Sequence, residues 1–183
     1  MKFTPINAAL AAAGVLLATS AFAADRLSKD AYASEKDRIA AEYKVDIQRC
    51  ASLSGNAKDI CKAEVKGKRN SARADAYAAY KGTDGAATDA LIAHADAEYA
   101  VAKEKCDDLA GNPKGVCVKE AKAAHIKAKV DAKTNGKVSE LRKDAAQDKR
   151  DANYEIAKER CDALAGDAKT QCINEAKTRF GKS

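Results

Sequence analysis

The chain of 183 residues has few of the residue types that build catalytic centres, cofactor pockets or turn-rich β domains. It contains no tryptophan, two histidines, one methionine and two prolines, and aromatic residues make up only 5% of it. With only two histidines in the chain, a catalytic centre built on histidine is not expected. Two prolines and ten glycines argue against a disordered linker and against an all-β domain with many turns. We therefore expect no enzyme activity and no catalytic, cofactor-binding or metal-ligating residue.

Alanine and charged residues take the place of the missing types. The chain has 43 alanines, 33 lysines and arginines, and 27 aspartates and glutamates. Alanine is the best helix former, so this composition predicts an all-α protein. Leucine, isoleucine, valine and phenylalanine together number only 21 in residues 24–183, which predicts elongated, loosely packed helices around a small core.

The first 23 residues have the pattern of a cleaved secretory signal. Lys2 precedes an apolar stretch over residues 8–18, and Ala21-Phe22-Ala23 provides a cleavage motif of small residues. The apolar stretch is well short of the ~20 residues that a membrane-spanning helix needs. A retained membrane-anchoring N-terminus is the alternative. We expect cleavage after Ala23, a periplasmic or secreted location, and no transmembrane segment in residues 24–183.

Six cysteines mark three copies of an internal repeat. The pairs are Cys50 and Cys61, Cys106 and Cys117, and Cys161 and Cys172, each separated by eleven positions. Each copy carries a tyrosine seven residues before the first cysteine, a leucine three after it, and a glycine two further on. Such self-similarity indicates duplication. It divides the chain into a signal peptide, 1–23, and repeats at 24–82, 83–136 and 137–183.

Each copy is expected to fold as an αα-hairpin closed by its own disulfide. In the second copy Gly111 is placed to end one helix with positive φ, and Asn112 and Pro113 are placed to begin the next. The two cysteines lie five residues before the glycine and five after the asparagine, so antiparallel helices bring them together. An exported protein with an even cysteine count favours disulfides. Bridges between copies and a metal site are the alternatives.

The turn residues between the copies predict six helices in three tandem hairpins. Lys81-Gly82-Thr83-Asp84-Gly85 separates the first copy from the second, and Thr134-Asn135-Gly136 separates the second from the third. The hairpins are expected to dock loosely on one another. The expected helices span about 26–54, 57–81, 84–110, 113–134, 138–165 and 168–180.

Two groups of side chains are candidates for binding. The densest basic stretch could dock on an anionic surface, although a solvated helical face is the simpler interpretation. His94 and His125 could hold a metal, although surface histidines on helices are the simpler interpretation. No aromatic platform or groove-reading helix for nucleic acid is present in the sequence, so no sequence-specific nucleic-acid binding is expected. The basic candidates are Lys62, Lys66, Lys68, Arg69 and Arg73.

The alanine-, lysine- and glutamate-rich helices after a signal resemble the helical stalk of the TolA family, and the uncharacterised exported helical proteins of Gram-negative bacteria that share its composition. The resemblance rests on composition over residues 24–183 and assigns no role to any residue. It implies a helical component of the cell envelope. We expect a non-enzymatic structural or protein-interaction protein whose partner is an envelope protein or an anionic envelope surface. The alternative is a periplasmic stress protein that binds anionic surfaces or metal through its basic residues or histidines.

Overall fold

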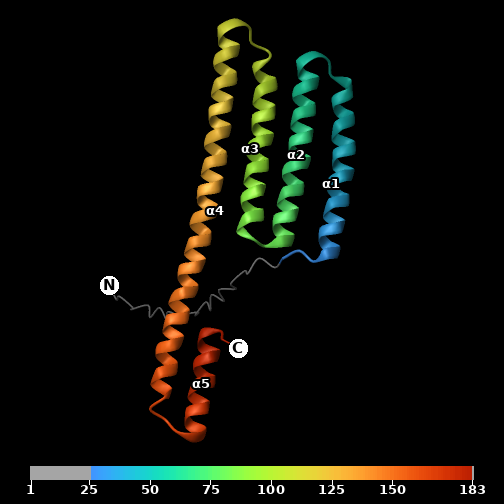
Figure 1. Ribbon diagram of the computed structural model, residues 1–183. Coiled ribbons are helices and arrows are strands. Elements are labelled where there is room, and N and C mark those ends of the chain that lie inside the picture. The colour runs from blue at the N-terminus through green and yellow to red at the C-terminus, as the bar shows by residue number, and fades with distance from the viewer. Residues whose placement is uncertain (1–25, 183) are drawn as a thin grey trace, which may run out of the picture.

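The computed structural model describes residues 26–182, and within this range the chain forms helices joined by short connections, without a β-strand (Figure 1). The predicted signal peptide lies outside the described residues. A short 3₁₀ turn, Cys50–Ser52, follows the first helix. The α-helices are α1 (Lys29–Arg49), α2 (Gly55–Lys81), α3 (Asp84–Cys106), α4 (Gly111–Cys161) and α5 (Gly166–Phe180).

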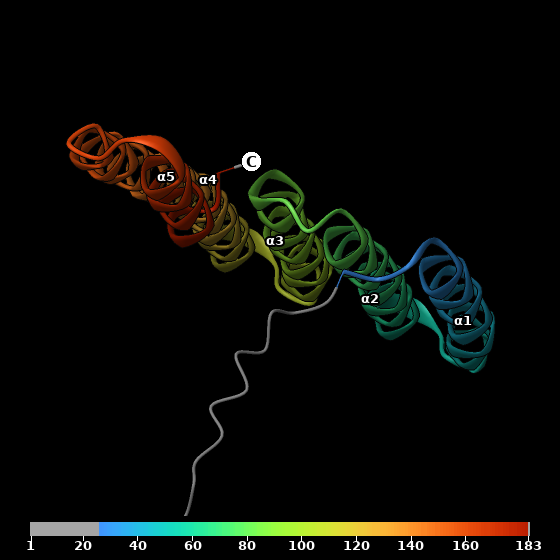
Figure 2. The same ribbon diagram turned by 90° about the horizontal axis from the view of Figure 1, so that it is seen from below.

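The helices form a single layer in which each one contacts only its neighbours in the chain. Helices α1 to α4 lie side by side in alternating directions, and the view along their axes shows them as one row (Figures 1 and 2). Helix α5 packs against the C-terminal part of α4. Since no helix of residues 26–182 covers a face of the row, both faces stay open.

The prediction of six helices is wrong, because α4 runs without a break through Thr134, Asn135 and Gly136. The repeat boundary expected between residues 136 and 137 therefore lies inside a helix of 51 residues. Gly136 keeps helical backbone angles and is not among the glycines with positive φ. A Cβ atom at this position would collide with the Thr88 Oγ1 atom of α3. The glycine thus permits a close helix contact, where the sequence pattern predicts a turn.

Between the first two copies one helix ends and the next begins, as predicted. Gly82 adopts the left-handed conformation (φ 59°) that ends α2. The hydroxyl of Thr83 then accepts a hydrogen bond from the Ala86 amide at 3.2 Å and begins α3. Ser28 caps α1 in the same way.

Disulfides within each copy close the tips, with the pairing that the sequence predicts. They join Cys50 to Cys61, Cys106 to Cys117, and Cys161 to Cys172, with Cα–Cα distances of 5.6–5.7 Å.

The tip glycines have positive φ as expected, but they open the following helix and do not end the preceding one. Helix α3 ends at Cys106, four residues before the predicted end, because its last turn tightens: the Leu109 amide donates to the Cys106 carbonyl oxygen at 3.1 Å. Ala110, and not Asn112, precedes the first residue of α4, and its side chain makes no cap.

The core is as small as the composition predicts. The buried apolar side chains of residues 26–182 are those of six alanines, three cysteines and Ile39. Ile39 is 2% exposed and lies on α1 against α2. Twelve larger apolar side chains are more than a third exposed. Burial therefore stabilises each helix pair only modestly.

The first two copies dock more closely than predicted. Among the helices of residues 26–182, α2 and α3 make the most extensive contact, although they belong to different copies. Gly67 is buried there, and a Cβ atom on it would lie 2.9 Å from the Ala97 Cβ atom. The Ser71 hydroxyl, also buried, donates to the Ala93 carbonyl oxygen at 3.5 Å.

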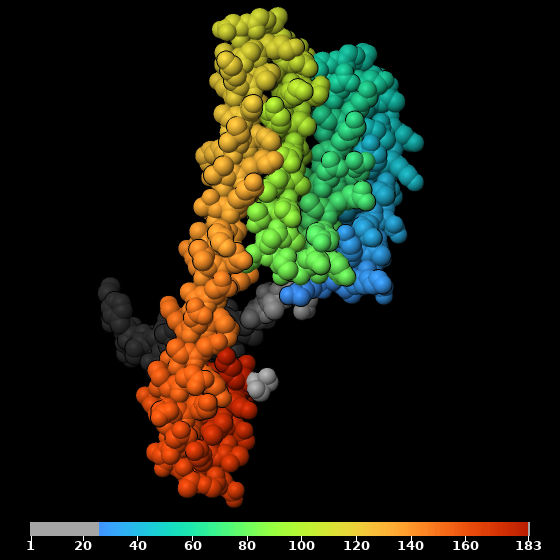
Figure 3. Space-filling model, viewed as in Figure 1, coloured from blue at the N-terminus to red at the C-terminus, as the bar shows by residue number. Residues whose placement is uncertain are grey.

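The third copy stands apart from the first two. Helix α5 contacts α4 alone, and every residue from 141 to 150 of α4 is exposed (Figures 1 and 3). This stretch joins the part of α4 beside α3 to the part beside α5. None of the helices in residues 26–182 combines the length and the apolar composition that crossing a membrane requires.

Removing one tip disulfide is expected to cost stability that the small core cannot replace. The C106A/C117A double variant should lose up to about 3 kcal/mol of unfolding free energy, because the loop between the cysteines is no longer restrained in the unfolded chain. Urea unfolding followed by circular dichroism measures the change. An unaltered urea midpoint would show that this disulfide does not contribute to the stability of the fold.

Two glycine-to-alanine variants should change stability in opposite directions. At Gly67 the new methyl group meets the Ala97 Cβ atom, so α2 and α3 must separate, at a cost of about 1–3 kcal/mol. Gly115, inside α4, has no heavy atom within 4 Å of the added Cβ position, so G115A should gain about 0.5–1 kcal/mol from helix propensity. Thermal or urea unfolding of both variants tests this. Equal stabilisation by both would contradict a close α2–α3 contact.

Candidate functional site

The close contact between α2 and α3 leaves a groove on each face of the layer. Gly67 and Ala97 line both grooves, because small side chains at the contact cannot fill the space beside it. We call the two hollows the His94 groove, of about 630 Å³, and the Asp96 groove, of about 600 Å³. The sequence contained one signal for them: a glycine inside a helix costs about 1 kcal/mol and often marks close packing.

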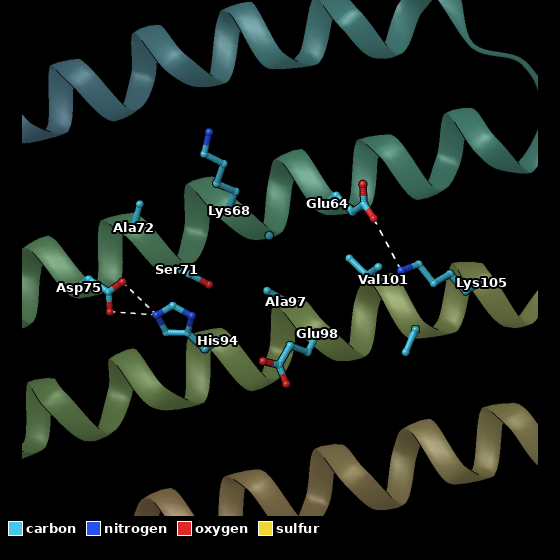
Figure 4. Close-up of a pocket in the computed structure, with 12 residues that line it drawn as sticks. Glu64, Lys68, Ser71, Ala72, Asp75, His94, Ala97, Glu98, Val101 and Lys105 are labelled. Atoms are coloured by element: carbon cyan, nitrogen blue, oxygen red, sulfur yellow. Dashed lines mark hydrogen bonds and ion pairs between the residues drawn. The ribbon is translucent and has the colours of Figure 1, made fainter.

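The His94 groove has an apolar floor between charged rims (Figure 4). Its lining residues are Glu64, Gly67, Lys68, Ser71, Ala72, Asp75, His94, Ala97, Glu98, Val101, Ala102 and Lys105. One ion pair and one histidine–aspartate hydrogen bond cross from α2 to α3. The Glu64 carboxylate lies 3.7 Å from the Lys105 ammonium, and the Asp75 carboxylate lies 2.9 Å from Nε2 of His94. These exposed pairs add little stability, but they place both signs of charge along an apolar strip.

The arrangement in the His94 groove suits binding better than nucleophilic chemistry. Its one hydroxyl group, on Ser71, is buried and donates to the Ala93 carbonyl oxygen. The His94 ring is held by Asp75 at the rim. A serine nucleophile needs a hydrogen-bonded base, and Ser71 has a backbone partner in its place. What the groove offers is a strip of alanine and valine that can accept apolar side chains.

The predicted basic stretch is divided between the two faces of the layer. Lys62 and Lys66 line the Asp96 groove, and Lys68 lines the His94 groove. Lys68 donates to the Asp46 carboxylate of α1 at 2.9 Å. The structure therefore does not bring the five candidates together as one patch.

Three of the basic candidates, Lys66, Arg69 and Arg73, share one face of α2 with Lys62, since spacings of three and four match the helical period. The Lys62 ammonium pairs with Asp59 at 3.1 Å. The Arg69 guanidinium lies over the Tyr43 ring at 4.3 Å and also donates to the Asn70 side chain. Lys66 and Arg73 are exposed. Any anionic ligand would therefore meet these three residues and not Lys68.

The two histidines lie apart, each held by its own aspartate. Nε2 of His94 contacts Asp75 on α2, and Nε2 of His125 lies 2.5 Å from Asp96 on α3. Lys129 reaches the same Asp96 oxygen at 3.2 Å. Within residues 26–182 no group of three or more metal-ligating side chains forms around either histidine.

The repeat explains His125 as a packing residue. Its ring stacks on Tyr99 with centroids 4.7 Å apart, just as the Arg69 guanidinium covers Tyr43. Both partners lie 26 positions after the tyrosine, where the third copy has Phe180. In the first two copies the tyrosine ring therefore packs against a residue of the paired helix.

Ion pairs to neighbouring segments of the chain lower the pKa values of four aspartates. A hydrogen bond from Lys68 lowers the pKa of Asp46, and one from Lys143 lowers that of Asp84. Asp96, which joins α3 to α4, has its pKa lowered first by His125 and then by Lys129. Lys182 similarly lowers the pKa of Asp151, where the chain returns along α4.

These pairs predict a loss of stability in acid. Because the pKa of each aspartate is lower in the folded state, each pair stabilises the fold above the ordinary value of 3.8, and this contribution disappears as the pH falls through the folded pKa. The melting temperature should fall between about pH 5 and pH 3, and less steeply at high salt. Circular dichroism at several pH values measures it.

The K68M variant provides the control, because it removes the partner of Asp46 but keeps the aliphatic stem. It should have a lower melting temperature at neutral pH and a smaller drop in acid. A melting temperature that is constant from about pH 5 to pH 3 would contradict the stabilising role of the pairs.

No protein-family model, no curated protein and no solved structure matches this chain. Its site is therefore interpreted from the chemistry of its own residues.

Proposed function

We propose that this protein is a non-enzymatic, exported helical repeat protein of the cell envelope that binds another polypeptide along the His94 groove. The observation that carries this proposal is the apolar strip of Ala72, Ala97, Val101 and Ala102 between rims of both charges. An amphipathic segment laid in such a groove buries its apolar side chains on the strip and pairs its charges with the rims.

The disulfides support the location outside the cytoplasm. All six cysteines are paired within the described part of the chain, and such pairs persist in oxidising compartments. With the signal pattern over residues 1–23, they favour export to the periplasm.

The face carrying Lys66, Arg69 and Arg73 supports a second candidate function, binding to an anionic envelope surface. The exposed Lys66 and Arg73 and the half-buried Arg69, at helical spacing, attract phosphate groups through long-range electrostatics. This attraction is screened by salt, whereas an apolar groove contact is not. Salt dependence therefore distinguishes the two functions.

Photo-crosslinking from one helix tests the groove. A photoreactive residue at Glu98, on the rim, should form a discrete protein adduct in the intact envelope. Lys103 provides the matched control, because it is exposed on the same helix but does not line either groove. The adduct from position 98 should survive high salt, and V101D should reduce its yield about tenfold by placing a charge on the floor.

Equal labelling from positions 98 and 103, or no adduct from either, would contradict polypeptide binding in the groove. Retention on the envelope that is lost in high salt and in a K66E/R69E/R73E variant would favour the anionic surface. Circular dichroism confirms that each variant is folded.

A further inference from the structure

The outer face of α4 carries large apolar side chains along almost its whole length. Six of them are 38–56% exposed: Val116, Ile126, Val130, Val138, Leu141 and Ile156. At 100° per residue they fall within about one third of the circumference of the helix. Over 40 residues this α4 stripe is about 60 Å long.

The α4 stripe points away from the rest of the layer. Ala132, which is buried, and Gly136, which meets Thr88 of α3, lie on the opposite side of α4. Cys161, bonded to Cys172 of α5, lies on that opposite side too. Figure 1 shows α3 and α5 along the same side of α4, so no helix of residues 26–182 covers the stripe.

The two edges of the layer differ in chemistry. On α1, the side opposite the buried Ile39 is exposed and polar, with Asp37, Lys44 and Gln48. The α4 edge instead exposes six large apolar side chains among its charges, and exposed apolar side chains gathered on one side of a helix are typical of a surface that associates. If two copies joined through α4 of one and α1 of the other, the polar edge of α1 would cover the stripe. Contact between the α4 helices of the two copies is therefore favoured.

The charges within and beside the stripe also match a second copy. One flank carries lysines in the N-terminal half of α4, among them Lys119 and Lys133, and the carboxylates of Asp144 and Glu155 in the C-terminal half. The other flank carries Asp131 in the N-terminal half and Lys149 in the C-terminal half. Antiparallel helices place each flank against the same flank reversed, and parallel helices place it against the other flank. Opposite charges face each other in both cases.

Charged side chains also lie within the third of α4 that carries the stripe: Lys119, Glu120, Lys127, Lys137, Asp144, Asp148 and Glu155. The Lys127 ammonium pairs with Asp131 at 2.5 Å, toward the flank, so its aliphatic stem can lie along the apolar side chains. A stripe about 60 Å long and about 10 Å wide buries about 600 Å² on each copy, near the lower end for specific protein pairs.

We propose that two copies of this chain pair through their α4 stripes to form a homodimer. The dimer leaves both grooves between α2 and α3 open, so this inference does not depend on the proposed function of the His94 groove.

Sedimentation equilibrium of the disulfide-bonded protein, with V130E and V45E variants, tests the dimer. Val130, on the stripe, is 55% exposed, and Val45, on α1, is 52% exposed, so neither glutamate disturbs a core. The wild-type protein and V45E should show the same monomer–dimer equilibrium, and V130E should raise the dissociation constant at least about tenfold. A wild-type protein that is monomeric throughout, or an equal effect of both variants, would overturn the proposal.

Zero-length crosslinking of lysines to carboxylates identifies the surfaces, using a mixture of isotopically light and heavy protein to recognise links between copies. Links between the α4 helices of two copies support the pairing, whichever direction the helices run. Links from α4 of one copy to α1 of another, or links that avoid α4, would overturn it.

Discussion

The structure depends on helix contacts made by alanine and glycine. Small side chains let two helices approach closely, as Gly67 and Ala97 do, but each such contact removes little apolar area from water. A layer built this way gains stability from neighbouring pairs, each of them weak. It has no large apolar face with which to hold a second layer of helices. The one-layer row therefore follows from the same composition that makes the chain helical.

The disulfides act where this packing is weakest. Each one joins paired helices near their tip, and the cysteines Cys50, Cys106 and Cys161 are also among the most deeply buried side chains of the described chain. The bond restrains the unfolded loop and its sulfur atoms fill space that alanine leaves. This matters most in the third copy, because α5 has a single neighbouring helix and the adjoining stretch of α4, 141–150, is exposed on every side.

Local patterns predicted the helical class and the disulfide pairing, because both depend on residues close in sequence or repeated at a fixed spacing. The unbroken α4 could not be predicted in this way. The local sequence Asn135-Gly136 predicts a turn. Only the position of Thr88 on α3 shows that Gly136 allows the two helices to pack closely. The grooves and the separation of Lys66 from Lys68 also depend on which helices become neighbours. Sequence periodicity describes the faces of one helix, but not which faces meet.

An open layer with unlike edges separates its binding surfaces. The grooves lie on the faces, at the α2–α3 contact, whereas the α4 stripe lies on an edge two helices away from α2. Because α4 touches α3 but not α2, occupation of its outer side leaves the His94 groove unobstructed. A compact bundle of the same helices would bury one of these surfaces to form its core. A chain too poor in large apolar residues to form that core keeps both its faces and its edge available, and the few large residues of α4 then stabilise contact between molecules more than they stabilise the fold.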